Sequence, residues 1–278
     1  MENVVSIKWL REHLHDPRLI ILDATIPDTI TKKQPIYPNL KIKGARFFDI
    51  KGMFSDADAT FPNTIPSEKQ FTKAAQEIGI QKDSIIVVYD ALGIYSSPRA
   101  WWLFKVMGHK QVAVLDGGLN AYINAGLPTE PLHTTAIHVK GNFEASLQPQ
   151  WIVSKETVLH NLNTKEALVI DARNADRFSG QQPEPRPQVR SGHIPHSKNC
   201  PYTTVLSNGH FASIQEIQAI LSSLKIDTST PLIFSCGSGI TACILLLAFS
   251  LVTPNPKAIY DGSWTEWGSI SSLPIAVL

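Results

Sequence analysis

The segment PLIFSCGSGITACILLLAFSLV, residues 231–252, decides the fold of this chain. Its opening residues, 231–234, form a short apolar run that begins with proline. Residues 241–252 are apolar, longer and without a helix breaker, so we predict a strand, a tight loop and a helix in that order. Cys236 begins the loop, and two glycines follow it within three positions. Such a loop can turn its backbone N–H groups inward, toward the cysteine sulfur.

Cys236 is the predicted nucleophile. Successive loop amides and the positive end of the following helix together attract an anion. They therefore favour the thiolate, which is the nucleophilic form of cysteine. The alternative is a buried core cysteine, a common role for this residue type. A core cysteine rarely lies beside a Gly-Ser-Gly turn, so we interpret Cys236 as reactive.

The chain repeats itself at a spacing of 145 to 148 residues. Three apolar strand-like segments and one helix-capping sequence, Ser-x-x-Glu/Gln, each occur twice. A spacing this steady indicates a duplicated domain with only small insertions between the copies. The paired segments are 20–24 with 168–172, 84–90 with 231–236, 114–118 with 259–263, and 67–70 with 213–216.

The repeat fixes the expected architecture. Each copy contains β-rich apolar segments separated by helical patterns, which indicates an α/β fold with a largely parallel sheet flanked by helices. The length of 278 residues allows two such domains, each with its own core. We predict an N-terminal domain at 1–130, a polar linker at 131–150 and a C-terminal catalytic domain at 151–278.

Composition narrows the choice of partners and compartment. The formal charge is +1, without a basic patch or acidic tail, so neither nucleic acid nor a membrane surface is an expected partner. Cys200, Cys236 and Cys243 do not form a disulfide framework and lack the spacing of a zinc site. The N-terminus has no signal or transit pattern, and 241–252 is shorter than the roughly 20 residues that cross a bilayer. A cytoplasmic protein is expected.

The two copies differ at their chemical centre. Where the second copy has Cys236, the first has Asp90, which cannot carry a transferable sulfur. We therefore predict that the first domain is catalytically silent and lines one side of a cleft between the domains, a common place for a small-molecule site.

Four motifs together resemble the tandem rhodanese family, and the resemblance covers nearly the whole chain. They are the loop 236–242, Asp171-Ala-Arg173, Gly192-His-Ile-Pro195 and 261–267. Within the family, the loop Cys-Gly-Ser-Gly-x-Thr resembles that of the 3-mercaptopyruvate sulfurtransferases. Thiosulfate sulfurtransferases instead tend to carry Arg and Lys directly after the cysteine. A doubly charged thiosulfate would benefit from those cations, whereas this loop offers only dipoles and a hydroxyl.

The resemblance implies an activity and a site. Cys236 would take sulfur from 3-mercaptopyruvate, release pyruvate, and pass the sulfur from a persulfide to cyanide or a thiol acceptor. The acceptor would be a small thiol or a thioredoxin-like protein, and neither a cofactor nor a metal is needed. The implied site comprises the catalytic residues Cys236, Ser238 and Thr241, with substrate contacts from Arg177, Arg186, Gly237, Gly239, Ile240 and Tyr95.

Arg177 and Arg186 match the family's carboxylate-binding arginines, and a guanidinium fork suits a planar carboxylate. Two other roles remain open. Arg177 could pair locally with Asp171 or Asp176, and Arg186 could be a solvated loop residue.

Three rival activities are weighed against this one. Cysteine phosphatases share the strand–loop–helix cradle but need an arginine six positions after the cysteine, where this chain has Ala242. A thiosulfate sulfurtransferase, or a non-catalytic persulfide-carrying or protein-binding module, remains an alternative. One departure keeps the last alternative open: Lys41 stands where we place the family's proton-relay histidine, in Lys41-Ile-Lys-Gly-Ala. Either Ser238 acts without that histidine or the activity is low, and we expect His193 in the second copy to be structural.

Overall fold

The computed structural model describes residues 1–26 and 32–278, and the chain divides into two compact units. Unit 1 contains Met1–Asp58, Ile65–Gln148 and Asn208–Phe211. Unit 2 contains Ala59–Thr64, Pro149–Ser207 and Ala212–Leu278. The short segment Ala59–Thr64 therefore belongs to unit 2 although it lies in the first half of the sequence.

The sheet of unit 1 has five strands in the order β1-β6-β5-β2-β4, and each pair of neighbours is parallel. Its central strand is buried at every position, as expected for an apolar run covered on both faces. A second, antiparallel pair joins β3 to β7. The strands are β1 (Val4–Val5), β2 (Leu19–Asp23), β3 (Leu40–Ile42), β4 (Arg46–Phe47), β5 (Ile85–Tyr89), β6 (Val112–Leu115) and β7 (Thr129–Pro131).

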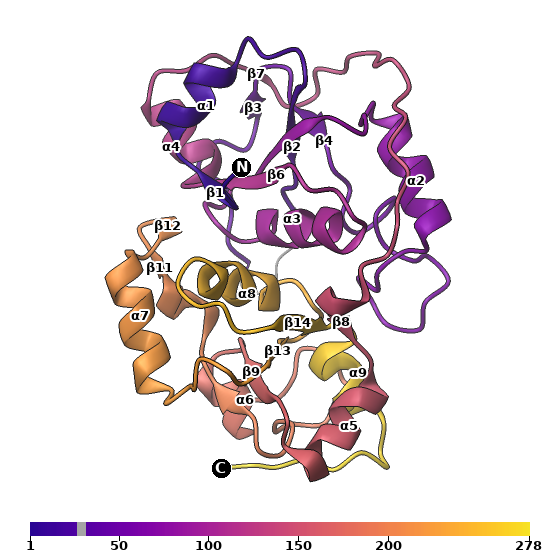
Figure 1. The fold of residues 1–278 in the computed structure, drawn as a ribbon, viewed down its shortest axis with the longest axis vertical. Coiled ribbons are helices and arrows are strands. Elements are labelled where there is room, and N and C mark those ends of the chain that lie inside the picture. Colours follow the sequence, from indigo (N-terminus) through magenta and orange to yellow (C-terminus); the bar gives the residue numbers. More distant parts are fainter. Residues whose placement is uncertain (27–31) are drawn as a thin grey trace. The chain divides into compact units, whose positions relative to one another are not determined.

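Helices cover both faces of this sheet (Figure 1). α1 (Ile7–His13) and α4 (Gly118–Asn124) pack on one face through a cluster that includes Leu10, Leu119 and Tyr122. On the other face, α2 (Glu68–Glu77) and α3 (Ser97–Val106) meet through the edge-to-face pair Phe71 and Phe104. The side chain of Ser67 caps α2 by accepting a hydrogen bond from the Gln70 amide, as the capping sequence predicts.

The sheet of unit 2 repeats the strand order of unit 1, as β8-β14-β13-β9-β10, again with parallel neighbours. The register of β13 pairs Ser235 with Asp171, so Cys236 and Asp171-Ala-Arg173 leave the same edge of the sheet. The strands are β8 (Ile152–Val153), β9 (Leu168–Asp171), β10 (Lys198–Asn199), β13 (Leu232–Ser235) and β14 (Lys257–Tyr260); β11 (Leu206–Ser207) and β12 (His210–Phe211) lie outside this sheet.

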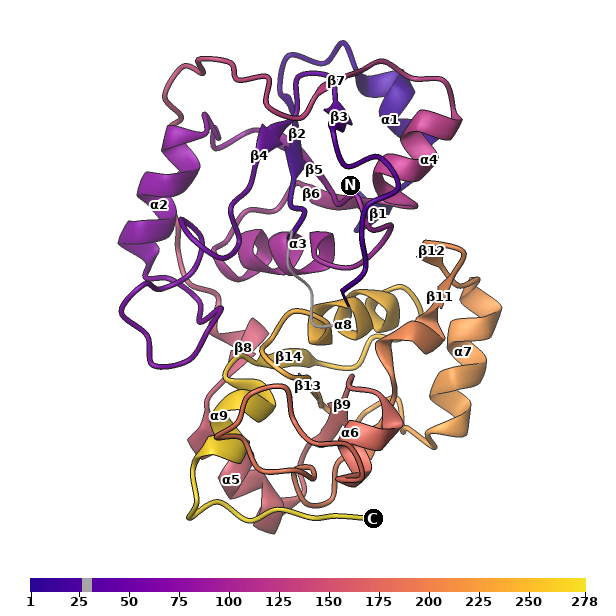
Figure 2. The same cartoon turned by 180° about the vertical axis from the view of Figure 1, so that it is seen from behind.

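The helices of unit 2 also repeat the layers of unit 1 (Figure 2). One face is covered through a cluster containing Val158, Trp264 and Trp267, and the other by the apolar helix that follows Cys236. Ser213 and Glu216 form the predicted capping box. The helices are α5 (Lys155–Thr164), α6 (Ala175–Ser179), α7 (Ile214–Ser223), α8 (Ala242–Ser250) and α9 (Ser263–Ser269), with 3₁₀ turns η1 (Pro149–Trp151) and η2 (Tyr202–Val205).

The predicted α/β class and the duplicated parallel sheets are confirmed. The segment Ile65–Gln148 belongs to unit 1, and at its end the Gln148 amide donates to the Val106 carbonyl. The division into domains at 1–130 and 151–278 with a linker at 131–150 stays a prediction. Within the described residues, no helix combines the length and apolar character that a bilayer crossing requires.

Candidate active site

The Cys236 loop begins at the carboxyl end of β13 and is held from one side by the start of α9. The Trp264 amide donates to the Cys236 carbonyl, and the Thr265 amide donates to the Gly237 carbonyl, both at 2.9 Å. In a trans peptide the C=O and the next N–H point in opposite directions. The amides of Gly237 and Ser238 therefore face away from α9.

The start of α9 also fixes the amide of Cys236 itself. Ser263, held at a positive φ of 51°, accepts a hydrogen bond from the Cys236 amide at 3.2 Å. The sequence motif 261–267 therefore acts as a clamp on the loop. Sequence reasoning used that motif for recognition but missed the roles of Ser263 and Thr265, because the contacts join residues about 28 positions apart.

The end of the loop leads directly into α8. Gly239 has φ +79°, a backbone conformation that suits glycine, and Ile240 is buried. Thr241 is the N-cap of α8, and its hydroxyl makes no capping hydrogen bond. The positive end of α8 thus adds to the loop amides on the side where an anion would lie.

Asn63 is the residue that contacts Ser238. Its Nδ2 lies 3.0 Å from Ser238 Oγ and 3.2 Å from the Ser238 carbonyl oxygen. Asn63 has φ 62° and lies in the sequence Pro62-Asn63-Thr64-Ile65-Pro66. Sequence reasoning missed Asn63, although an Asn between two prolines marks a loop in which a positive φ is common for that residue.

Lys41, which stands where the resemblance places the family's relay histidine, makes its contacts within unit 1. Its Nζ donates to the carbonyls of Ala45 and Thr134 at 2.8 and 2.7 Å and lies 3.2 Å from Glu130. These contacts satisfy all three N–H bonds of the ammonium group, which agrees with the expectation that Lys41 does not act as a base. Within unit 2, Asn63 contacts Ser238.

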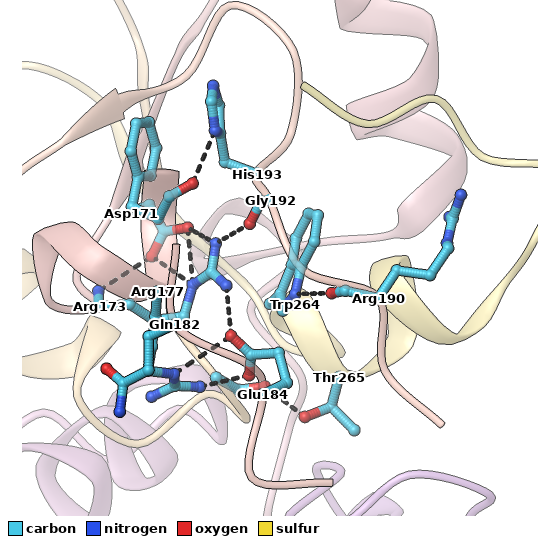
Figure 3. Close-up of polar contacts among 12 residues, drawn as sticks. Asp171, Arg173, Arg177, Gln182, Glu184, Arg190, Gly192, His193, Trp264 and Thr265 are labelled. Atoms are coloured by element: carbon cyan, nitrogen blue, oxygen red, sulfur yellow. Dashed lines mark hydrogen bonds and ion pairs between the residues drawn. The ribbon is translucent and has the colours of Figure 1, made fainter. Parts of the chain in front are cut away.

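A buried ion network in unit 2 joins the last residue of β9 to residues that follow it (Figure 3). Arg173, 2% exposed, binds Asp171 and Glu184, and its guanidinium stacks on Trp264 at 4.5 Å. Glu184 also accepts from Arg177, with Nη2 at 2.6 Å and Nε at 3.1 Å. Arg177 therefore pairs with Glu184, and not with Asp171 or Asp176 as the alternative interpretation proposed.

The paired Arg177 lies against the loop. A Cβ placed on Gly237 would approach Arg177 Nη2 to 3.1 Å, tighter than ordinary van der Waals contact. Glycine at this position lets the guanidinium approach the backbone next to Cys236. The structure thus brings together Arg177, Gly237 and Cys236, three of the predicted site residues.

Arg186 has different surroundings. Its Nη1 donates to Thr265 Oγ1 at 3.1 Å, and within residues 1–26 and 32–278 no carboxylate forms a salt bridge with it. Burial lowers the pKa of Arg186, as does the nearby charge of Arg177, while Glu184 and Cys236 act in the opposite direction. Arg186 is therefore a half-buried cation close enough to Cys236 to feel its charge.

Other singled-out residues have structural contacts. The Nδ1–H of His193 donates to the Phe178 carbonyl at 2.8 Å, its ring stacks on Phe178, and burial lowers its pKa. Cys243 is fully buried in α8, and its thiol donates to the Gly239 carbonyl. Burial raises the pKa of Cys200, which favours its neutral thiol.

In unit 1, the loop that corresponds to the Cys236 loop binds a carboxylate of the chain itself. The Asp90 carboxylate follows β5 and accepts hydrogen bonds from the amides of Leu92, Tyr95, Ser96 and Ser97 and from the Ser97 hydroxyl. Tyr95 is buried in unit 1 and contributes its amide to this cradle. Its predicted contact with substrate stays a prediction.

Unit 1 also contains a cavity of about 720 Å³, lined mainly by apolar atoms and by Lys41, Arg46 and Glu130. None of the predicted site residues lines it. We base the candidate site on Cys236 and its neighbours, because they supply the nucleophile, the amides and the cations.

Comparison with known proteins gives consistent matches. A family model described as a Rhodanese-like domain matches residues 6–125 and again residues 154–270. The chain is 37% identical over 276 residues to the 3-mercaptopyruvate sulfurtransferase of Escherichia coli strain K12, covering 98% of this chain and 96% of that protein. It is 37% identical over 275 residues to the thiosulfate sulfurtransferase of Rattus norvegicus, covering 95% and 91%. The crystal structure of SseA, a 3-mercaptopyruvate sulfotransferase from Escherichia coli, matches with a TM-score of 0.83 and 33% identity, covering 95% of this chain and 99% of that one.

Proposed function

The chain belongs to the rhodanese family, as a sulfurtransferase with two tandem rhodanese-like domains, and from this premise we propose that its sulfur donor is 3-mercaptopyruvate. The observation that carries the proposal is Arg186, a half-buried guanidinium next to Cys236 whose recorded partner is the neutral Thr265 hydroxyl. A desolvated cation of this kind is stabilised by an anionic ligand.

The charges around the loop favour a singly charged donor. The cations Arg173 and Arg177 are matched by the carboxylates Asp171 and Glu184. In the described part of this site, Arg186 is thus the guanidinium left for a substrate. The one carboxylate of 3-mercaptopyruvate balances it, whereas thiosulfate would bring a second negative charge.

The first half-reaction forms a covalent intermediate on Cys236. The thiolate attacks the substrate sulfur, an S–S bond forms, and the substrate C–S bond breaks with its electron pair moving to the carbonyl as an enolate. The products are a Cys236 persulfide and the pyruvate enolate, which takes up a proton to give pyruvate. The loop amides of Gly237 and Ser238 and the N-terminus of α8 stabilise the persulfide anion.

The Asp90 loop supports this role for the amides. At the repeat spacing of 146, the Tyr95 and Ser96 amides that bind the Asp90 carboxylate correspond to those of Thr241 and Ala242. The same backbone design that holds a carboxylate in unit 1 would hold the outer sulfur in unit 2.

The second half-reaction regenerates the enzyme. A thiolate acceptor attacks the outer sulfur, the persulfide S–S bond breaks, and Cys236 leaves as the thiolate; cyanide would leave as thiocyanate. A small thiol or a thioredoxin-like protein suits this step. Thr241, whose hydroxyl is not used as a cap, is available to donate a hydrogen bond to the transferred sulfur.

Two alternatives remain candidates on specific grounds. The chain is 37% identical to a thiosulfate sulfurtransferase, so thiosulfate is the first alternative donor. Cys236 is 1% exposed, which would slow its reaction with a donor. A protein that carries a persulfide without efficient turnover is therefore a second alternative.

One experiment separates these functions. Pyruvate release is measured with 3-mercaptopyruvate, and thiocyanate formation is measured with thiosulfate and cyanide. The mass of the protein is determined by mass spectrometry after treatment with each donor. We expect rapid pyruvate release and a mass increase of about 32 Da that maps to Cys236. Cys236→Ser should abolish both, and the control Cys243→Ser should retain both. Pyruvate release that survives Cys236→Ser would overturn the proposal.

A further inference from the structure

The hydrogen bonds between Asn63 and Ser238 fix which group donates. The same Asn63 atom lies 3.2 Å from the Ser238 carbonyl oxygen and 3.0 Å from its Oγ. A carbonyl oxygen only accepts, so the contacting atom must be the amide nitrogen, which only donates. Ser238 Oγ is therefore the acceptor in this pair.

The direction of this hydrogen bond limits where the Ser238 hydroxyl hydrogen can point. The hydroxyl cannot donate back to an amide nitrogen, so its hydrogen must point elsewhere. Ser238 is 8% exposed, so the loop interior is the main place where an acceptor could be. A hydroxyl that accepts one hydrogen bond also becomes a better donor, because chains of hydrogen bonds polarise each other.

The charged groups recorded around this loop in unit 2 leave Ser238 without a base. They are Cys236 itself, the cations Arg177 and Arg186, and Glu184, which is held by Arg173 and Arg177. Within the described residues of unit 2, neither a histidine nor a carboxylate accepts a hydrogen bond from Ser238 Oγ.

From this geometry we propose that Asn63 is a positioning residue that makes Ser238 a dedicated hydrogen-bond donor to the substrate carbonyl, so that sulfur transfer proceeds without a titrating base at this serine. The inference rests on the proposed function, because the acceptor is the carbonyl oxygen of 3-mercaptopyruvate. Asn63 thus takes the place of a relay histidine beside Ser238. It holds the Ser238 hydroxyl in position and transfers no proton.

The step balances without proton transfer by Ser238. As the S–S bond forms and the C–S bond breaks, negative charge moves onto the substrate carbonyl oxygen, where the Ser238 O–H stabilises it. The product is a protonated persulfide and the enolate. The enolate gains one proton and the persulfide loses one through water, giving pyruvate and the persulfide anion.

The sharpest test reverses the polarity of the Asn63 contact with almost no change in shape. Asn63→Asp replaces the amide donor by a carboxylate, which draws the Ser238 proton toward itself. We expect kcat for pyruvate release at pH 7.5 to fall about 10- to 100-fold, approaching Ser238→Ala, since losing one oxyanion donor costs about 10²–10³. Asn63→Ala should cost about 2- to 10-fold, the worth of one net hydrogen bond. The matched control is Asn163→Asp on exposed α5, with unchanged kcat.

A pH profile distinguishes positioning from a merely structural role. For the wild type, a plot of kcat against pH should show no transition near the pKa of histidine. Asn63→His places a titratable ring at Ser238, and kcat should then depend on pH with an apparent pKa near 6.5. In the Ser238→Ala background, Asn63→Asp should lose most of its effect on kcat, because the contribution through the hydroxyl is gone and only the Asn63 contact with the Ser238 carbonyl remains.

The outcomes separate this inference from the proposed function. Thermal unfolding of every variant establishes that it is folded. If the wild type releases pyruvate and Asn63→Asp retains full kcat, or if its full effect persists without the Ser238 hydroxyl, the positioning role is wrong while the proposed function stands. If the wild type releases no pyruvate, the proposed function fails, and the positioning role fails with it, because thiosulfate has no carbonyl oxygen to accept the Ser238 hydrogen bond.

Discussion

Two arginines near Cys236 look alike in the sequence but differ in their electrostatic surroundings. Arg177 shares Glu184 with Arg173, and this ion pair directs its guanidinium toward Gly237. Arg186 donates to a neutral hydroxyl. We therefore assign the substrate carboxylate mainly to Arg186, with Arg177 shaping the loop wall.

This assignment predicts the effect of Arg186→Gln. Losing one charge-assisted hydrogen bond, worth about 1.5–3 kcal/mol, should raise KM for 3-mercaptopyruvate about 10- to 100-fold. Steady-state pyruvate release measures it. The control is Arg18→Gln, an exposed arginine paired with Asp16, which should leave KM unchanged. An unchanged KM for Arg186→Gln would mean that another group binds the carboxylate.

At the scale of elements, the β5–α3 turn supports the prediction that unit 1 is catalytically silent. Its amides already bind an anion that belongs to the chain, because Asp90 accepts five hydrogen bonds from residues 92–97. The β13–α8 turn has the same position in its sheet but begins with Cys236. The change from Asp90 to Cys236 at the start of the loop therefore separates a filled cradle from one that we propose receives sulfur.

Asp90→Ala should destabilise the protein strongly. Its removal leaves several buried donors without a partner, at a cost on the order of 2–4 kcal/mol. Asp90→Asn should cost less, because one carbonyl oxygen remains. Urea unfolding of the full chain measures both, with exposed Asp83→Ala as the control. A loss for Asp90→Ala no larger than that of the control would show that the cradle is not stabilised by this carboxylate.

His109 links α3 to β6 and gives the fold a predicted acid sensitivity. It is 3% exposed, packs against Phe104 and Phe143, and burial lowers its pKa to about 4. Between pH 6.5 and 4 the unfolded chain binds a proton that the folded chain does not. The free energy of unfolding should therefore fall as the pH falls through this window, by up to about 3 kcal/mol from this group.

His109→Phe should remove this part of the pH dependence, because phenylalanine fits an aromatic cluster and does not titrate. Urea unfolding between pH 4 and 7 measures it, and His160→Gln on exposed α5 is the control. The same slope in His109→Phe and the wild type would contradict a neutral buried histidine.

At the scale of the whole molecule, the two copies share an architecture but differ in the charges near their loops. Both units keep the same strand order and helix layers, but the cation network lies in unit 2. The overall charge near zero says little about the substrate, whereas the local balance that leaves Arg186 uncompensated favours a monoanion.

This balance predicts donor preference. We expect kcat/KM for 3-mercaptopyruvate to exceed that for thiosulfate by at least about tenfold, the factor that corresponds to 1.4 kcal/mol. Ser238→Lys adds a cation to the loop and should shift the ratio toward thiosulfate. Ser229→Lys, on an exposed turn, should not change it. A wild type that prefers thiosulfate would contradict the charge argument.

The sequence by itself determined the duplicated α/β architecture, the loop that joins Cys236 to an apolar helix, and the capped starts of α2 and α7. These features follow from hydrophobic periodicity and from residues a few positions apart, which act on the local backbone. Only the tertiary structure decided that Asn63 contacts Ser238 across 175 residues and that Glu184 joins Arg173 to Arg177. Such pairs depend on where the chain returns in space, and residue spacing along the sequence carries no direct signal of that path.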